Sequence, residues 1–427
     1  MAHNQKLSLK EAILININIM LGSGIFINTV LLANNVAILS GCMYLLNGLL
    51  VLPLILNMTA LMRLHPRGGF YTFGAQEINN LAGFISAWSY FIGKLASAAL
   101  MIHTAFLLIQ TIIHAFCAID IFYLDIIALL CFTALNLLHM KVSMTVQSAA
   151  FIIKLIPIFF VLLSGLFLIS PGEWSAPESA FTIINALPLV LFTVLGFEAT
   201  LSLSSKIENP DSNGPRAILI AFGAVVGLSF LFQTLFYLAL GDALAAFPNF
   251  LLAFPALISK MSSNAHFVYY ASSFFHLAIA TSALGGAYSI LFSTHWNLYT
   301  IAEHNDIVGA SFLTRLNKHA MPMVGITLQA IICTLYFICT RGNQIPLQLT
   351  ASFGCTIAYT TSVIALLCAQ QKRSTGVAPW IAWCALLNCG LFIASGVYSL
   401  LASTVVSFGL FISMFVIGVL LHVAKRP

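Results

Sequence analysis

Long apolar segments follow one another along almost the whole of this chain. A helix needs about 20 apolar residues to cross the hydrocarbon core of a bilayer. Hydrophobic residues make up 60% of the sequence and charged residues 7%, whereas soluble domains carry about 25% charged residues. We therefore expect an all-α polytopic membrane protein. Its twelve predicted spans are 12–33, 37–61, 82–113, 121–138, 142–169, 183–205, 215–240, 266–300, 322–340, 346–369, 378–399 and 403–424.

Positive charges test this count, because cytoplasmic loops carry an excess of Lys and Arg. With the N-terminus inside, the outside loops hold only Lys260 and Arg341, and Lys94 and Lys154 fall within spans. Adding or removing one span would move all later loops to the opposite side and destroy this asymmetry. We therefore keep the even count and expect both termini in the cytoplasm. The inside segments hold Lys6, Lys10, Arg63, Arg67, Lys141, Lys206, Arg216, Arg315, Lys318, Lys372, Arg373, Lys425 and Arg426.

No low-complexity linker divides the chain, so residues 1–427 are expected to form a single transmembrane domain. The nine cysteines lie almost all in apolar segments without a CxxC pair, so we expect no disulfide, no metal site and no cofactor. The net charge of +5 reflects topology, and we expect no nucleic-acid partner. The apolar loop 242–262 contains Pro248 and Pro255, which is typical of a re-entrant or interfacial segment.

The first span contains Gly22-Ser23-Gly24-Ile25-Phe26, a stretch that a membrane helix normally avoids. Gly costs a helix interior about 1 kcal/mol relative to Ala, and a break in lipid frees backbone groups that need partners. Gly196-Phe197-Glu198 interrupts the sixth span in the same way. Paired interruptions in two halves of a membrane protein point to a transporter's binding site. The alternative is close packing of small residues, although Gly22 and Gly24 are too close in sequence to form one packing stripe.

Three stretches together resemble the amino acid–polyamine–organocation transporter superfamily. They are Gly22–Phe26, the loop His65–Phe73 with its Gly68-Gly69 pair, and the run from Gly196 to Ala217. The resemblance implies a leucine-transporter-type fold with two inverted five-helix repeats, at about 12–169 and 183–369. Two peripheral helices would follow at about 378–424. The first and sixth spans then correspond, in agreement with the paired breaks.

An amino-acid substrate brings a carboxylate and an ammonium. The N-terminus of a half-helix offers free N–H groups to the carboxylate, and unwound carbonyls suit the ammonium. We therefore expect the backbone of Ser23, Gly24 and Ile25, and that of residues 195–197, to bind substrate. Phe192, six residues before Glu198, is a candidate aromatic gate. Phe292 in the eighth span is another, although 34 phenylalanines are present in the chain.

Two ionisable residues within spans are candidates for proton coupling. Burial favours the neutral form of a carboxylate, so Glu198 could exchange a proton; the alternative is a structural hydrogen bond that ties the break to a neighbour. Lys154 is similar to a lysine that takes the place of sodium in proton-coupled relatives. Its alternative is a permanent cation that joins the first, fifth and eighth spans. We expect the scattered histidines within or beside spans to serve packing or hydrogen bonding: these are His103, His276 and His295.

In the family that this chain resembles, the third helix faces the substrate at the position where Lys94 falls. A cation there would attract an acidic side chain and repel an arginine-like one, so we hypothesise an acidic, or at least not basic, substrate. The alternatives are a salt bridge to Glu198 and a side chain that extends along the helix. The candidate substrate-binding residues are Gly22, Ser23, Gly24, Ile25, Lys94, Phe192, Gly196, Phe197 and Phe292.

The favoured function is a secondary active amino-acid transporter that works by alternating access, through proton symport or exchange. A polyamine or amino-acid–product antiporter and a nutrient sensor without net transport stay open as alternatives. An enzyme is not expected, because the 12 acidic residues lie mostly in loops. The expected partners are an amino acid or amine, protons and the lipid bilayer. The expected location is a bacterial inner membrane, with a monomer and a homodimer both open.

Overall fold

The computed structural model describes residues 6–138, 140–169, 174–177, 179–403 and 405–425; Arg426 lies outside them. Regular structure in these residues is helical apart from two isolated bridges. The α-helices are α1 (Leu9–Met20), α2 (Gly24–Val36), α3 (Cys42–Leu64), α4 (Phe70–Glu77), α5 (Asn80–Ile112), α6 (Ile121–Asn136), α7 (Met140–Phe167), α8 (Ala180–Val194), α9 (Ala199–Ser202), α10 (Pro210–Leu240), α11 (Ala253–Ser259), α12 (Ala265–Glu303), α13 (Ala310–Leu313), α14 (Met323–Thr340), α15 (Gln344–Lys372), α16 (Pro379–Ser403) and α17 (Val405–Val423). Short 3-10 helices are η1 (Ala37–Ser40), η2 (His114–Ala118), η3 (Ser204–Lys206), η4 (Gly241–Leu244) and η5 (Phe250–Leu252).

A helix, or a pair of helices, lies at each of the twelve predicted spans. Among the described residues, eight helices are long and apolar enough to cross a membrane, and α1 with α2, bent by 41°, would add a ninth. The 16 residues of α6 rise only about 24 Å, less than the roughly 30 Å hydrocarbon core. The multi-pass helical membrane protein is confirmed, whereas twelve crossings and the inverted repeat stay predictions. The eight helices are α3, α5, α10, α12, α14, α15, α16 and α17.

Polar side chains fix where several helices begin. Ser8 and Glu11 form a capping box at the start of α1. Asn79 accepts a hydrogen bond from the first turn of α5, and Asn264 accepts two from the first turn of α12. Such side chains satisfy backbone N–H groups that have no acceptor within the helix.

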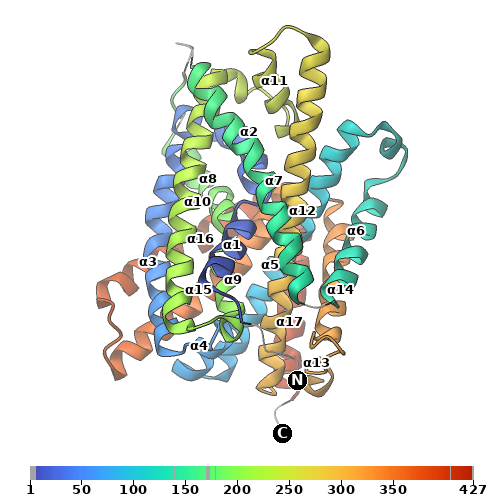
Figure 1. The fold of residues 1–427 in the computed structure, drawn as a ribbon. Coiled ribbons are helices and arrows are strands. Elements are labelled where there is room, and N and C mark those ends of the chain that lie inside the picture. Colours follow the sequence, from blue (N-terminus) through green and yellow to red (C-terminus); the bar gives the residue numbers. More distant parts are fainter. Residues whose placement is uncertain (1–5, 139, 170–173, 178, 404, 426–427) are drawn as a thin grey trace.

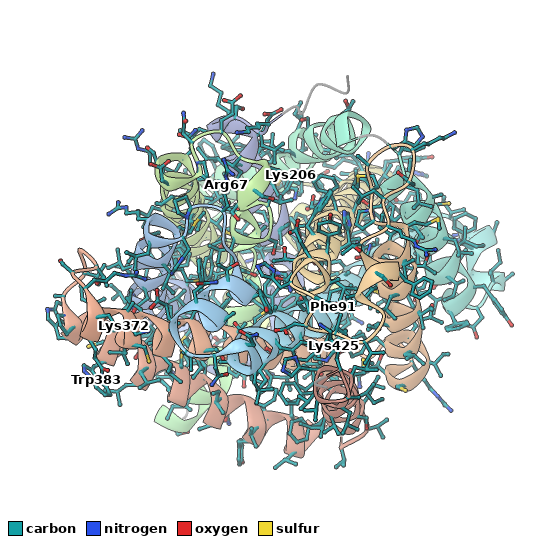
Figure 2. The ribbon with its side chains drawn as sticks, turned by 90° about the horizontal axis from the view of Figure 1, so that it is seen from below. Arg67, Phe91, Lys206, Lys372, Trp383 and Lys425 are labelled. Atoms are coloured by element: carbon teal, nitrogen blue, oxygen red, sulfur yellow. The ribbon has the colours of Figure 1, made fainter. Side chains whose placement is uncertain are left out.

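The centre of the bundle is formed by α5, against which α12 and α15 both pack. The buried share of the most apolar stretch is 67% in α5 and α15 and 78% in α12. In α16 and α17 it is only 33% and 28%. Figure 1 shows both chain ends, α4 and α13 at the lower end of the bundle, and α11 at the upper end. Seen from below, Arg67, Lys206, Lys372 and Lys425 are spread over the lower end (Figure 2). Both chain ends lie at one end of the molecule, as an even number of crossings requires, and a cytoplasmic lower end stays a prediction.

Candidate functional site

Two interrupted helices meet inside the bundle. Residues 21–23 separate α1 from α2, and residues 195–198 separate α8 from α9. Gly196 has a φ of +132°, and an added Cβ would lie 2.5 Å from Ile19 Cγ2 and 2.9 Å from the backbone nitrogen of Met20. The second break therefore requires glycine, both for its backbone conformation and because the first break packs directly against it.

The freed carbonyl groups of the first break bind two side chains from other helices. Lys154 on α7 is fully buried, and its Nζ donates to the carbonyl oxygens of Asn18 at 2.8 Å and Leu21 at 3.1 Å. Ser282 on α12 donates to the carbonyl oxygens of Leu21 at 3.1 Å and Gly22 at 3.2 Å. The lysine thus joins α1 to α7, and the serine joins the same break to α12.

The N–H side of the first break has unpaired polar groups. The first N–H groups of a helix have no acceptor within it. Among the described residues, neither the backbone N–H of Ser23 and Ile25 nor the buried Ser23 Oγ has a hydrogen-bond partner. Gly24 lies against Phe192, since an added Cβ would be 3.1 Å from its ring. A carboxylate at the N-terminus of α2 would therefore meet free donors, with Phe192 beside it.

The glycines of the first break also permit close helix packing, which is the alternative that the sequence left open. A Cβ added to Gly286 on α12 would lie 3.1 Å from Gly22 Cα, and one added to Gly22 would lie 2.2 Å from Met101 Cε. The interruption of the helix and the close approach of its neighbours therefore coexist at Gly22.

A buried ion pair lies at the second break. Lys94 Nζ on α5 is 3.3 Å from Glu198 Oε1, and both side chains are at most 1% exposed. Glu198 Oε2 also accepts a hydrogen bond of 2.8 Å from the N–H of Gly196. Tyr90 on α5 and Tyr359 on α15 interact electrostatically with Glu198. The structure thus contains the salt bridge and the structural hydrogen bond that the sequence offered as alternatives for these two residues.

The comparison with known families decides the class of this protein. The family model described as amino acid permease matches residues 7–427. The chain belongs to the amino acid permease family. The multi-pass permease that the resemblance implied is thereby confirmed at the level of the family.

Individual relatives of this permease are distant. It is 25% identical over 240 residues to an uncharacterized transporter of Mycobacterium tuberculosis, covering 52% of this chain and 50% of that protein. It is 27% identical over 309 residues to an uncharacterized protein of Methanocaldococcus jannaschii, covering 69% and 66%. A serine permease of Lactococcus lactis is 22% identical over 188 residues, covering 42% and 38%. The chain spans about half the length of the mycobacterial transporter that it matches.

Two further phenylalanines among the predicted substrate-binding residues, Phe197 and Phe292, have aromatic neighbours in this permease. The ring of Phe197 lies 5.8 Å from Phe222 on α10 and 5.5 Å from Tyr359 on α15, so it packs between two helices beside Glu198. The ring contact described for Phe292 is with His295 on its own helix, at 5.9 Å. A substrate-gating role for Phe292 stays a prediction.

The three histidines singled out in the sequence all have hydrogen-bond partners. His103 Nδ1 lies 2.7 Å from Asp125 Oδ2, and His295 Nδ1 lies 2.9 Å from the carbonyl oxygen of Leu291. The contacts of His276, with Thr111 and with the Leu251 carbonyl oxygen, belong to the upper end of the bundle. None of these contacts reaches the breaks.

The permease is closed below and above the breaks. At the lower end, the backbone N–H of Leu7 donates to the carbonyl oxygen of Lys206 at 2.7 Å. The Lys206 ammonium lies over the ring of Trp296 on α12, 4.4 Å from its centroid. Towards the upper end, the ring of Phe26 on α2 lies 6.2 Å from that of Phe254 on α11. Contacts therefore lie on both sides of the breaks.

Tyr90, Tyr359 and Ser282 contribute to the site without having been predicted. Tyr90 precedes Lys94 by four residues on α5 and so shares its helix face, a signal that the sequence contains. Tyr359 and Ser282 come from α15 and α12, and only the packing of these helices brings them to the breaks.

Proposed function

We propose that this permease is a secondary active transporter that moves an amino acid across the membrane by alternating access. The observation that carries the proposal is the contact between the two helix breaks, one with unpaired N–H groups and the other with a buried carboxylate. Broken helices within a membrane are tolerated where protein or a wet cavity surrounds them, and they form the substrate site of many transporters. Two inverted repeats would let one group of helices rock against the other around the breaks.

The backbone and the ion pair suggest how a substrate would bind. Its carboxylate would accept hydrogen bonds from the N–H groups of Ser23, Gly24 and Ile25, and its ammonium would meet the carbonyl groups of residues 195–197. The Lys94–Glu198 pair carries no net charge, which favours a neutral side chain over a basic one. An acidic side chain would have to replace Glu198 as the partner of Lys94. The name of one relative, a serine permease, also fits a small neutral substrate.

Lys154 and Glu198 are the proposed coupling residues, and they permit two modes. In proton symport, one of them would gain and lose a proton in each cycle. In exchange, Lys154 would stay a fixed cation on the Asn18 and Leu21 carbonyl groups, and a second substrate would drive the return step. Exchange of a polyamine or of an amino acid for its product uses the same site. We propose that the permease is located in a bacterial inner membrane.

Uptake of labelled amino acids into proteoliposomes tests the proposal. Each amino acid is assayed with and without an inward proton gradient, and with and without unlabelled amino acid inside. Gradient-driven uptake into empty vesicles would identify a symporter, and uptake that needs internal substrate would identify an exchanger. If no amino acid or amine moves under either condition, the proposed substrate class is wrong, and a sensor without net transport becomes the favoured function.

A further inference from the structure

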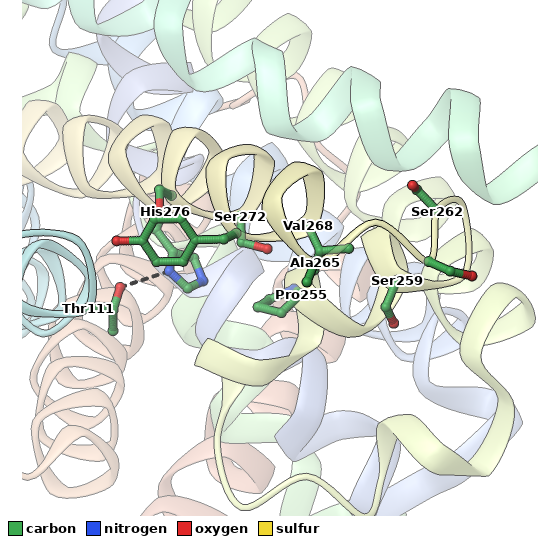
Figure 3. A pocket seen from close by; sticks show the side chains of 11 residues that line it. Thr111, Pro255, Ser259, Ser262, Ala265, Val268, Ser272 and His276 are labelled. Atoms are coloured by element: carbon green, nitrogen blue, oxygen red, sulfur yellow. Dashed lines mark hydrogen bonds between the residues drawn. The ribbon is translucent and has the colours of Figure 1, made fainter.

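An open cavity of about 480 Å³ lies at the upper end of the bundle, between α11 and the start of α12. This volume falls within the range of about 300–1,000 Å³ that is usual for small-molecule sites. Figure 3 shows Thr111 of α5 at one end of the cavity and Ser259 and Ser262 at the other. The cavity is separate from the helix breaks, whose residues do not line it. Its serines are Ser259, Ser262, Ser263, Ser272 and Ser273.

The lining offers hydroxyl groups and no Lys, Arg, Asp or Glu among the described residues. Hydroxyls both donate and accept hydrogen bonds. Ser272 is only 8% exposed, and its Oγ has no hydrogen-bond partner within the described chain. Lys260 follows Ser259, but its ammonium donates to the carbonyl oxygen of Ala239 at 2.7 Å. The cavity therefore suits a polar ligand without net charge.

His276 forms a fixed wall of this cavity. One ring nitrogen lies 2.9 Å from Thr111 Oγ1 on α5, as the dashed line in Figure 3 marks. The other lies 3.1 Å from the carbonyl oxygen of Leu251. Because both ring nitrogens have partners, a ligand in the cavity would bind hydroxyl groups, among which that of Ser272 is buried and has no partner within the described chain.

The cavity lies on a helix segment with the features of the membrane–water interface. Phe267, Tyr270 and Phe274 are 51%, 68% and 51% exposed on the first turns of α12, and Tyr269, which lines the cavity, is 48% exposed. Aromatic residues are enriched at the level of lipid headgroups. The 39 residues of α12 rise about 58 Å, so part of this helix must extend beyond the roughly 30 Å hydrocarbon core.

We infer that this cavity binds the headgroup and glycerol region of a zwitterionic phospholipid. Serine hydroxyls such as that of Ser272 would donate to phosphate and ester oxygens, while the half-exposed ring of Tyr269, the aromatic side chain in the lining, would contact the acyl chains. A site for anionic lipid would need basic side chains, which this lining lacks. The inference rests on the membrane location of the permease and not on its transport activity.

Native mass spectrometry of the delipidated, detergent-purified permease tests the inference. Phosphatidylethanolamine is added to the wild type, and phosphatidylglycerol is added in a parallel series. We expect one saturable phosphatidylethanolamine per chain and weaker retention of phosphatidylglycerol. Equal retention of the two lipids, or none of either, would overturn the proposal.

Variants locate the bound lipid. Ser272→Val removes the unpaired hydroxyl, and Ser259→Phe places a bulky ring at an exposed position of the lining. Ser272→Val should raise the half-saturating phosphatidylethanolamine concentration about fivefold, the effect of losing roughly one hydrogen bond. Ser259→Phe should raise it as well, because the ring obstructs the cavity. The matched control is Thr281→Val, because this hydroxyl lies on α12 outside the cavity and donates to the Leu277 carbonyl oxygen. Effects equal to those of the control would contradict the site. Displacement of the lipid by free amino acids would instead assign the cavity to a soluble substrate and reject the lipid.

Discussion

At the scale of single residues, Lys94 and Glu198 depend on each other. Each would be costly alone within a membrane, where a buried charge persists only with a partner. Together they form a neutral pair, and the carboxylate also binds the N–H of Gly196. A substrate that bound either charge would therefore have to displace the other. The pair accordingly couples substrate choice to the second helix break.

Removal of one charge should harm the permease more than removal of both. Lys94→Met leaves Glu198 buried and unpaired, which costs about 3–5 kcal/mol, whereas Lys94→Met with Glu198→Gln leaves no uncompensated charge. Thermal unfolding in detergent should therefore place the double variant between Lys94→Met and the wild type. Any residual uptake by Lys94→Met should shift towards basic amino acids. A double variant less stable than Lys94→Met would contradict a significant energetic coupling between the two residues.

At the scale of elements, the end of α1 is held from two directions. A helix interrupted within a membrane must have its free carbonyl groups satisfied by protein. Lys154 from α7 and Ser282 from α12 both donate to the carbonyl group of Leu21. The first half-helix is thus attached to two helices far from it in the sequence, and movement of α1 would have to break these bonds.

Loss of the Lys154 ammonium should therefore lower the stability of the permease more than loss of the Ser282 hydroxyl. Hydrogen bonds from charged groups contribute about 1.5–3 kcal/mol and neutral ones about 1 kcal/mol. We expect Lys154→Met to reduce stability by about 3 kcal/mol and Ser282→Ala by about 1 kcal/mol in thermal unfolding. The control is Ser289→Ala on α12, whose hydroxyl donates to the Gly285 carbonyl of its own helix. If Lys154→Met matched this control, the lysine would not hold the break.

A second link between elements lies at the lower end, where Tyr71 on α4 donates to Asp306 Oδ2 at 2.6 Å. Burial, then the hydrogen bond to Asp306 and its charge, raise the pKa of Tyr71 above its usual value. The phenol is therefore protonated in the folded and unfolded states below pH about 10. Below that pH, the hydrogen bond from the Tyr71 phenol makes a constant contribution to stability. The contribution is lost only as the pH rises above the pKa that the tyrosine has in the unfolded chain.

Tyr71→Phe should accordingly lower stability by about 1 kcal/mol, the usual contribution of one hydrogen bond, and by the same amount at pH 6 and pH 8.5. Chemical denaturation at the two pH values measures this directly. The shape of the pH profile of uptake should be unchanged, because this hydroxyl does not titrate in that range. A stability loss confined to one of the two pH values would show that another group controls the contact.

At the scale of the whole molecule, local sequence signals identified the helices and their breaks but not the surroundings of the breaks. Gly22 and Gly196 stand out because glycine is unusual within a membrane helix. Tyr359 and Phe292 carry no comparable signal. The ring of Tyr359 packs near Phe197 beside Glu198, that of Phe292 lies near His295, and the packing of α12 and α15 decides these surroundings. The number of crossings stays a prediction for a similar reason. Hydropathy can be read from the sequence, whereas the length of each helix depends on where packing and capping end it.

At the scale of the whole molecule, Lys206 holds the lower end together. Lys206 connects the chain start to the loop after α9 through the Leu7 hydrogen bond, and it connects that loop to α12 through Trp296. A cation–π contact contributes about 0.5–2 kcal/mol. Trp296→Leu should therefore increase the opening of this end about 2- to 30-fold. Hydrogen exchange of residues 7–12 and 204–208 measures this opening. Trp383→Leu on α16, where the ring is 57% exposed, should leave exchange unchanged. Equal protection in both variants would mean that the backbone contacts of Leu7, without Trp296, keep the lower end closed.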